Sequence, residues 1–327
     1  MRPPSWLGRA ARAGFLLLAV ALLLTYLWSE REGAGEAVRA IGAAYALASL
    51  AAVLVGLLAS MSVWRALLAD LGTELSLRAA FHVFFFGQLG KYVPGSVFAV
   101  AAQMELGRAQ GAARNRVATA SLLFMGVGLA VGLLVAAATL PLTSPDALRQ
   151  FAWVLLVLPV GLAVLAPPVL TRVVGVFLRL LRRPPLERPL TARRVGAATG
   201  WALVMWLAYG LHLWLLVRPQ GADAGGDLLL ATGGYALAWT AGFLFVVAPA
   251  GAGVREVALV AALAPVVDRP AALAVALLSR VLMTLGDLVL GAGGAAVRPR
   301  NGHGAGRSGA AVSSVTVVKQ LGKAADA

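Results

Sequence analysis

The sequence has no cysteine, three histidines, 14 acidic residues and only three lysines against 25 arginines in 327 residues. Without cysteine there are no disulfides, no thiolate metal sites and no cysteine nucleophiles. The histidines His82, His212 and His303 are far apart in the chain, so they do not predict a metal site. We therefore expect neither a metal ion nor a cofactor.

Catalytic motifs are missing as well. The chain contains no GxxxxGK[ST] phosphate loop, no GxSxG nucleophile turn, no HExxH zinc motif and no aspartate cluster suited to Mg²⁺. With so few carboxylates, the sequence favours a protein that is not an enzyme and predicts no catalytic residues.

The sequence is rich in long apolar segments. It is 60% hydrophobic and 13% charged, with a mean hydropathy of +0.84, whereas a soluble domain carries about 25% charged residues. This predicts an all-α, polytopic transmembrane helical bundle over residues 13–295. Segments of about 20 apolar residues cross a bilayer, which predicts seven spans, the first of them read as an uncleaved helix rather than a signal peptide. The predicted spans are 13–28, 37–60, 117–140, 151–171, 195–217, 228–248 and 271–291.

The net charge of +14 is concentrated in short loops, so it indicates membrane topology and not nucleic-acid binding. The 172–194 loop carries seven arginines against one glutamate, while the 29–36 loop has three glutamates and one arginine. Basic loops stay in the cytoplasm. We therefore expect a plasma (inner) membrane protein with residues 1–12 and the tail 296–327 in the cytoplasm, the tail being Gly/Ser/Ala-rich and disordered.

Residues 81–105 interrupt this pattern. The apolar segment contains Gly90-Lys91-Tyr92-Val93-Pro94-Gly95, in which glycines and proline break helical hydrogen bonding around a lysine. A broken helix at membrane depth needs protein or a watery cavity around it, and a cation there indicates a functional site. Because the flanking loops are both basic, the segment must enter and leave on the cytoplasmic side. We predict a re-entrant hairpin with Lys91 at its tip; the alternative is a lysine that reaches up to the headgroups.

A second broken element is expected at about 243–266. Pro249-Ala250-Gly251-Ala252-Gly253 precedes an apolar stretch of only 13 residues, which is too short to span. It is either a hairpin opening to the outer side or a full span with a short return. Two breaks opening to opposite faces give the hypothesis of an inverted repeat with a site near the midplane.

Charges near the two breaks are the candidate site residues. Arg255 and Glu256 open the short helix after the second break, and Arg280 and Asp287 lie seven apart on one face of the last span, either as a structural pair or in transport. Arg108, three residues after Glu105, can pair with it on the helix surface. The predicted substrate-binding residues are Lys91, Tyr92, Pro94, Gly95, Arg108, Arg255, Glu256 and Arg280.

Two motifs carry a resemblance. QLGKYVPGSVF (88–98) and PAGAGVREVALVAAL (249–263), with Leu278-Ser279-Arg280 after them, resemble the transmembrane domain of lysylphosphatidylglycerol synthase and related flippase-like membrane proteins. In the full synthase this domain moves an aminoacylated anionic lipid outward, and a separate soluble domain makes that lipid. The resemblance covers roughly residues 10–295 and implies a stand-alone member without the soluble domain.

The resemblance implies translocation of an anionic phospholipid or a polyprenyl-phosphate-linked molecule. Lys91 and Arg255 would bind the phosphate, with Arg108 and Arg280 in support. The alternative is a non-catalytic membrane partner subunit of a glycosyltransferase or of another cell-envelope assembly system.

Overall fold

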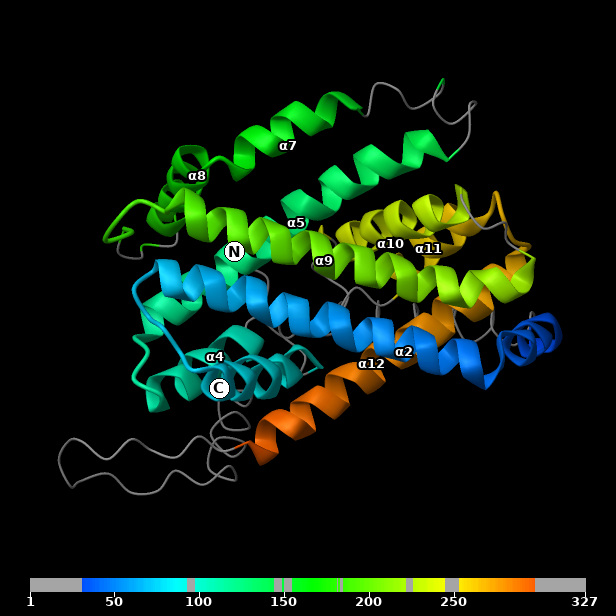
Figure 1. The fold of residues 1–327 in the computed structure, drawn as a ribbon, viewed down its shortest axis with the longest axis horizontal. Coiled ribbons are helices and arrows are strands. Elements are labelled where there is room, and N and C mark those ends of the chain that lie inside the picture. Colours follow the sequence, from blue (N-terminus) through cyan, green and yellow to red (C-terminus); the bar gives the residue numbers. More distant parts are fainter. Residues whose placement is uncertain are drawn as a thin grey trace, which may run out of the picture.

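The structure, a computed structural model, describes residues 31–92, 98–143, 149, 155–180, 182, 185–221, 226–244 and 253–297. Within these ranges every regular element is a helix, which confirms the all-α prediction (Figure 1). The elements in chain order are α2 (Arg31–Asp70), α3 (Leu77–Phe81), the π-helical turn η1 (His82–Phe86), η2 (Leu89–Tyr92), α4 (Phe98–Ala109), α5 (Arg114–Thr139), η3 (Leu140–Leu142), α7 (Val157–Leu165), α8 (Pro167–Leu180), α9 (Ala192–Val217), η5 (Arg218–Gln220), α10 (Gly226–Leu244), α11 (Val254–Leu263) and α12 (Arg269–Ala296).

The number of membrane-crossing helices is smaller than predicted. Among the described residues, four helices are long and apolar enough to cross a membrane, and a fifth span is added if α7 and α8 count together. The predicted total of seven is therefore not confirmed. The predicted span 13–28 lies outside the described residues, and α10, at the predicted span 228–248, is not among the four.

Helix α2 corrects the predicted loop at 29–36, because the helix already begins at Arg31 and continues for 40 residues. It bends at Gly42, whose φ of 66° is open to glycine but costly for other residues. At its other end the amide of Gly72 donates to the carbonyl of Ala69 and the amide of Thr73 to that of Leu68. This left-handed glycine cap ends the helix.

The predicted span at 151–171 is broken. Helices α7 and α8 meet at an angle of 78°. Pro167 and Pro168 explain the break, since a proline forces the preceding residue out of the helical region, and Ala166 has the extended ψ of 130°. The predicted basic loop at 172–194 is consequently shorter, because its first nine residues belong to α8.

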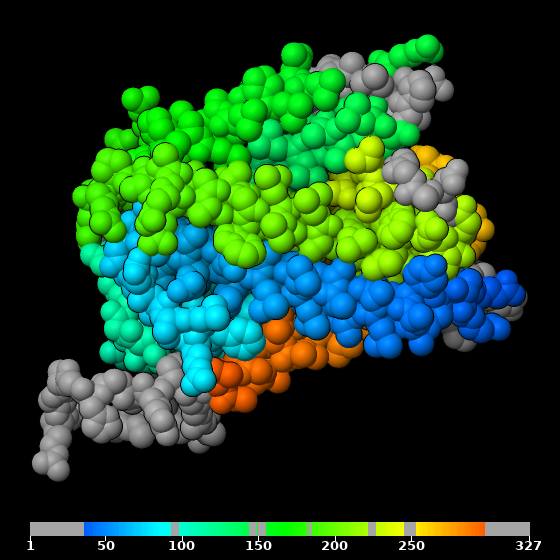
Figure 2. All heavy atoms as spheres, viewed as in Figure 1, coloured from blue at the N-terminus to red at the C-terminus, as the bar shows by residue number. Residues whose placement is uncertain are grey.

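The core of the bundle is a close pairing of long helices. Figure 2 shows α2 and α9 side by side across one face, with α12 emerging beyond α2. Helix α5 packs on α9 where the ring of buried Trp206 lies against Gly132 and its indole N–H donates to the carbonyl of Gly128, 3.0 Å away. Small residues at such crossings let helices approach closely in a membrane.

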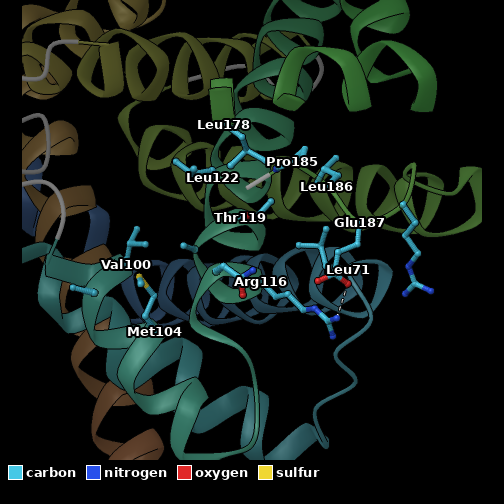
Figure 3. Close-up of a pocket in the computed structure, with 14 residues that line it drawn as sticks. Leu71, Val100, Met104, Arg116, Thr119, Leu122, Leu178, Pro185, Leu186 and Glu187 are labelled. Atoms are coloured by element: carbon cyan, nitrogen blue, oxygen red, sulfur yellow. Dashed lines mark hydrogen bonds and ion pairs between the residues drawn. The ribbon is translucent and has the colours of Figure 1, made fainter. Parts of the chain in front are cut away.

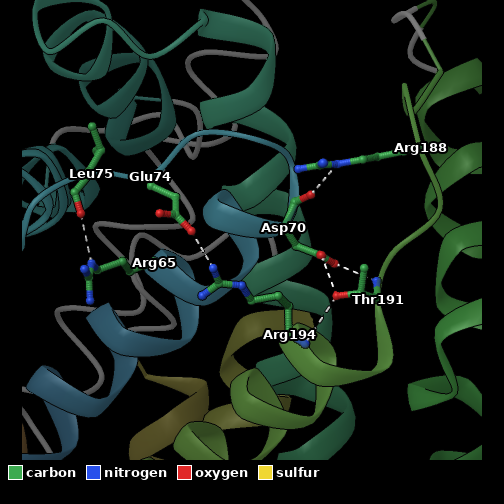
Figure 4. Close-up of polar contacts among 7 residues, drawn as sticks. All are labelled: Arg65, Asp70, Glu74, Leu75, Arg188, Thr191 and Arg194. Carbon is green, nitrogen blue, oxygen red and sulfur yellow. Dashed lines mark hydrogen bonds and ion pairs between the residues drawn. The ribbon is translucent and has the colours of Figure 1, made fainter.

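Basic side chains link the segments that meet at one end of the bundle, where α2 ends and α5 and α9 begin (Figure 4). The buried carboxylate of Asp70 accepts hydrogen bonds from the backbone N–H and the hydroxyl of Thr191, and Arg188 donates to the Asp70 carbonyl. Arg194 pairs with Glu74, and Arg116 donates to the carbonyl of Gly72. The segment between α2 and α5 therefore starts and ends at one end of the bundle, as a hairpin there requires.

Candidate functional site

The first hairpin consists of two helical arms in direct contact. The descending arm runs through α3, η1 and η2, and α4 returns. Gly90 lies so close to α4 that a Cβ atom on it would be 2.8 Å from the amide nitrogen of Ala99. The glycine next to Lys91 is therefore needed for the close approach of the arms. The tip, including the predicted site residues Pro94 and Gly95, lies outside the described residues.

Helix α12 packs against this hairpin through glycines. Gly291 faces Leu89, and Gly294 lies against the backbone of Phe86 and Phe81. The Nδ1 atom of His82 also bonds to the carbonyl of Gly294, 2.7 Å away. This close packing sets Lys91 and Tyr92, at the end of the descending arm, beside the charged residues of α12.

Lys91 and Tyr92 both bind the carboxylate of Asp287 on α12. The Lys91 Nζ atom is 2.6 Å from Asp287 Oδ2, and the Tyr92 hydroxyl donates to the same oxygen at 2.6 Å. The lysine side chain is 32% exposed and the aspartate only 5%. A charge-assisted contact this short is among the strong interactions of a protein interior.

The second hairpin is formed by α10 and α11, which pack against each other. Gly253, with a φ of 85°, precedes α11 and its N–H donates to the Glu256 carboxylate at 2.7 Å. An acid that caps the first turn of a helix stabilises that helix terminus. The predicted break residues Pro249 and Gly251 lie outside the described residues.

The second hairpin also reaches α12 through a charge. Buried Glu256 lies 3.5 Å from the Nη1 atom of Arg280. Its neighbour Arg255 does not go to α12 but lies over the ring of Tyr235, 4.6 Å from the centroid, and its Nη2 group donates to the Tyr235 hydroxyl. Arg255 directly precedes Glu256 in α11, so the second hairpin brings both charges to the same end of that helix.

We call these five side chains the charge cluster. It is built by three parts of the fold, namely the first hairpin, the second hairpin and α12. Its members are Lys91, Arg255, Glu256, Arg280 and Asp287. The structure thus brings together four of the predicted site residues, and Tyr92 beside them.

A buried histidine lies behind the cluster. His212 is fully buried on α9, with Nδ1 2.6 Å from the Ser49 hydroxyl and Nε2 2.8 Å from that of Ser279. The Ser49 hydroxyl donates its one proton to the His212 carbonyl, so Nδ1 is the donor to Ser49 and Nε2 accepts from Ser279. This neutral ring joins α2, α9 and α12 and has all its hydrogen bonds satisfied.

Arg108 is not brought to the cluster. Its side chain is 62% exposed on α4, with Nε 3.5 Å from Glu105, as the three-residue spacing predicts. Arg114 approaches Glu105 more closely, at 2.7 Å, and its hydrogen bond lowers the pKa of that carboxyl.

Tyr235 is the member of the site that sequence reasoning missed. The sequence singles out Asp287 as a charge inside the last span, in a structural pair or in transport, but not as a predicted substrate-binding residue. For Tyr235 only its position within an apolar helix is visible in the sequence. Its role comes from its contacts with Arg255 and with the ring of Tyr209, whose centroid is 5.5 Å away.

A cavity of about 520 Å³ adjoins the returning arm of the first hairpin (Figure 3). Its wall is mainly apolar, with the Arg116–Glu187 ion pair of 2.6 Å and Arg188 at its rim. The cavity lies between α4, the start of α5, the end of α8 and the 185–188 segment. Its lining includes Val100, Met104, Leu122, Leu178 and Leu186.

Metal binding has no support in the part of the chain that the structure describes, where no three His, Cys, Asp or Glu side chains group as ligands. Acid and base side chains are instead paired with one another. The arrangement suits recognition of charge, with Lys and Arg donors at two helix breaks.

Fold and site together define a polytopic α-helical membrane protein in which one long helix joins two helical hairpins through ion pairs. Its family follows from the sequence: the family described as the lysylphosphatidylglycerol synthase TM region matches residues 11–291, and the chain belongs to this family. The suspected resemblance is thereby confirmed. No curated protein matches the chain.

Proposed function

We propose that this protein translocates an anionic lipid, either a phospholipid or a polyprenyl-phosphate-linked molecule, across the plasma membrane. The observation that carries the proposal is the composition of the charge cluster. It has three cations and two carboxylates, an excess of one positive charge. Because an unbalanced charge is costly in hydrocarbon, a bound anion would stabilise this site.

Arg255 is the group best placed to hold a phosphate. A guanidinium has five N–H donors, and Tyr235 accepts from Nη2 while its ring supports the cation from one face. The other edge of the planar fork suits two phosphate oxygens at once. Lys91 adds a second cation that is partly exposed at the first hairpin.

The cavity beside α4 is our candidate site for the apolar part of the substrate. Its volume of about 520 Å³ falls within the range of small-molecule sites, which are mostly apolar with a few polar groups. An acyl or prenyl chain fits such a wall. In the topology expected from the basic loops, the cavity is on the cytoplasmic side.

The test is leaflet exchange of labelled lipids in proteoliposomes. We expect exchange of labelled phosphatidylglycerol with the wild type and a loss of tenfold or more in Arg255→Ala, since a hydrogen bond to a charged group contributes about 1.5–3 kcal/mol and 1.4 kcal/mol is a factor of ten. Arg179→Ala is the matched control, because this arginine lies in α8 with its Nε bonded to the carbonyl of Gly175.

The result that would overturn the proposal is equal exchange in wild type and Arg255→Ala, or no exchange of any phosphatidylglycerol or polyprenyl-phosphate lipid. The second result would favour the partner subunit of a glycosyltransferase. In that case, substitutions on the 185–191 segment would affect function more than those in the charge cluster.

A further inference from the structure

The Lys91 site is already occupied by an anion of the protein itself. Lys91 and Tyr92 direct their donor groups at one oxygen of Asp287, with both distances 2.6 Å. A lipid phosphate presents the same kind of oxygen to the same donors. The two anions therefore cannot use this pair of donors at the same time.

We propose that Asp287 is an internal competitor, which a lipid phosphate must displace from Lys91 and Tyr92 before the first hairpin can bind substrate. This inference rests on the function proposed above and assigns a role to a residue outside the predicted site. It makes Asp287 a specificity-determining residue, because a zwitterionic headgroup such as phosphatidylcholine carries a cation beside its phosphate and has no net negative charge with which to displace a carboxylate.

The exposure of Lys91 and Asp287 indicates from which side a headgroup reaches the pair. Lys91 is 32% exposed and Asp287 only 5%, so an incoming headgroup meets the lysine from the open side while the aspartate covers its inner side. Displacement then leaves Asp287 buried and short of its two donors. An unpaired buried carboxylate is unfavourable, so Asp287 returns to Lys91 when the substrate leaves.

The second pair on α12 is unaffected by this exchange. Arg280 lies seven residues before Asp287, two helical turns or about 10.5 Å along the axis, and is held by Glu256 of the other hairpin. Loss of the Asp287 contact therefore removes one polar link between α12 and the first hairpin, while the glycine packing of the two and the contact of α12 with the second hairpin persist.

Lys91 offers a direct probe, because the chain has only two other lysines, Lys319 and Lys323 in the tail. The purified full-length protein is placed in nanodiscs of phosphatidylcholine with increasing phosphatidylglycerol and treated with an amine-acetylating reagent. Peptide mass spectrometry gives the acetylation rate of Lys91 relative to the tail lysines, which corrects for surface charge.

Asp287→Asn should raise the relative acetylation rate of Lys91 in pure phosphatidylcholine by about tenfold. It should also lower the mole fraction of phosphatidylglycerol that gives half-protection by about tenfold, because removing a competing state removes its penalty on apparent affinity. Tyr92→Phe deletes one donor to Asp287 and the same donor to the phosphate. It should therefore raise the acetylation rate by a smaller factor and leave the half-protecting mole fraction of phosphatidylglycerol close to that of the wild type. Glu74→Gln, which removes the ion pair of Glu74 with Arg194 outside the charge cluster, is the matched control and should leave both unchanged.

Each remaining outcome is decisive. Equal rates and equal protection in wild type and both variants would overturn the competition while leaving the proposed function standing. Absence of protection by phosphatidylglycerol in every variant would overturn the anionic-lipid function at this site. Protection by inorganic phosphate in phosphatidylcholine discs, without protection by phosphatidylglycerol, would overturn the assignment to a lipid. Should Asp287→Asn not fold, Tyr92→Phe alone decides the question.

Discussion

The two hairpins contact α12 in the same manner but with opposite charge. The first contributes a cation, Lys91, to an anion of α12, whereas the second contributes an anion, Glu256, to a cation of α12. The second also carries Arg255, which lies on the ring of Tyr235. The first contact is therefore electrically neutral, and the excess positive charge belongs to the second.

In the function that we propose, this difference gives the two contacts different roles. In the mechanism that we propose, an incoming anion opens the neutral first contact and Asp287 closes it again. The second keeps a guanidinium available whatever the state of the first.

Reversing charge at the first contact should have the largest effect. Asp287→Lys places two cations together in a buried position, and breaking a buried pair typically costs 3–5 kcal/mol. We expect a strongly lowered unfolding temperature and poor recovery of monodisperse protein in detergent. Adding Lys91→Asp should restore much of the loss, because the pair is rebuilt with its ends exchanged.

The corresponding exchange at the second contact, Glu256→Arg with Arg280→Glu, is expected to rescue less. Glu256 also accepts from the backbone N–H of Gly253, and an arginine cannot accept that bond. Equal rescue at both contacts would contradict the difference drawn between the hairpins. Fluorescence-detected size exclusion after heating provides the measurement.

Gly90 tests the packing of the first hairpin. A Cβ atom there would lie 2.8–2.9 Å from backbone atoms of Phe98 and Ala99, and overpacking of this kind costs about 1–3 kcal/mol. Gly90→Ala should lower thermal stability accordingly. Gly126→Ala in α5, where a Cβ atom meets nothing within 4 Å, is the control and should be neutral or slightly stabilising.

Because the clash of Gly90→Ala is with backbone, a smaller residue on the opposite arm cannot relieve it. Ala99→Gly should therefore not rescue the variant. Rescue would show that the arms separate easily and that the hairpin is more loosely packed than the structure indicates.

Local chemistry explains which features were predictable from the sequence. The breaks were visible because glycine and proline act on their own backbone, and Lys91 and Arg255 were visible because charge in an apolar segment is rare. The pairing of Lys91 with Asp287 was not visible, since it joins residues 196 positions apart through the packing of Leu89 on Gly291. No local pattern encodes such a contact.

Two errors in the predicted spans have a different cause. Hydropathy measures the apolar length of a segment but not the direction of its helix axis. The predicted span 151–171 therefore includes Pro167-Pro168, where the structure bends by 78°. The helix-forming residues from Arg31 onward were assigned to a loop because charge was read as a topology signal alone. At Pro167-Pro168, proline geometry outweighed the composition of the segment; the helix over Gly33 and Gly35 is not explained by helix propensity.

The smallest expected effect comes from the Tyr235 hydroxyl and separates the two ways in which Tyr235 holds Arg255. Tyr235→Phe removes the acceptor of Nη2 but keeps the aromatic face and the other donors of the guanidinium, so it should reduce leaflet exchange by less than Arg255→Ala does. Tyr235→Leu removes the face as well, together with the edge contacts to Tyr209 and His212, and should approach the loss seen in Arg255→Ala. If the two variants lose exchange equally, the hydroxyl and not the ring positions the guanidinium. Tyr235 belongs to the second hairpin, whereas Lys91 of the first hairpin lies over the ring of Tyr92, 5.5 Å from its centroid. The acetylation rate of Lys91 should therefore be the same in both variants.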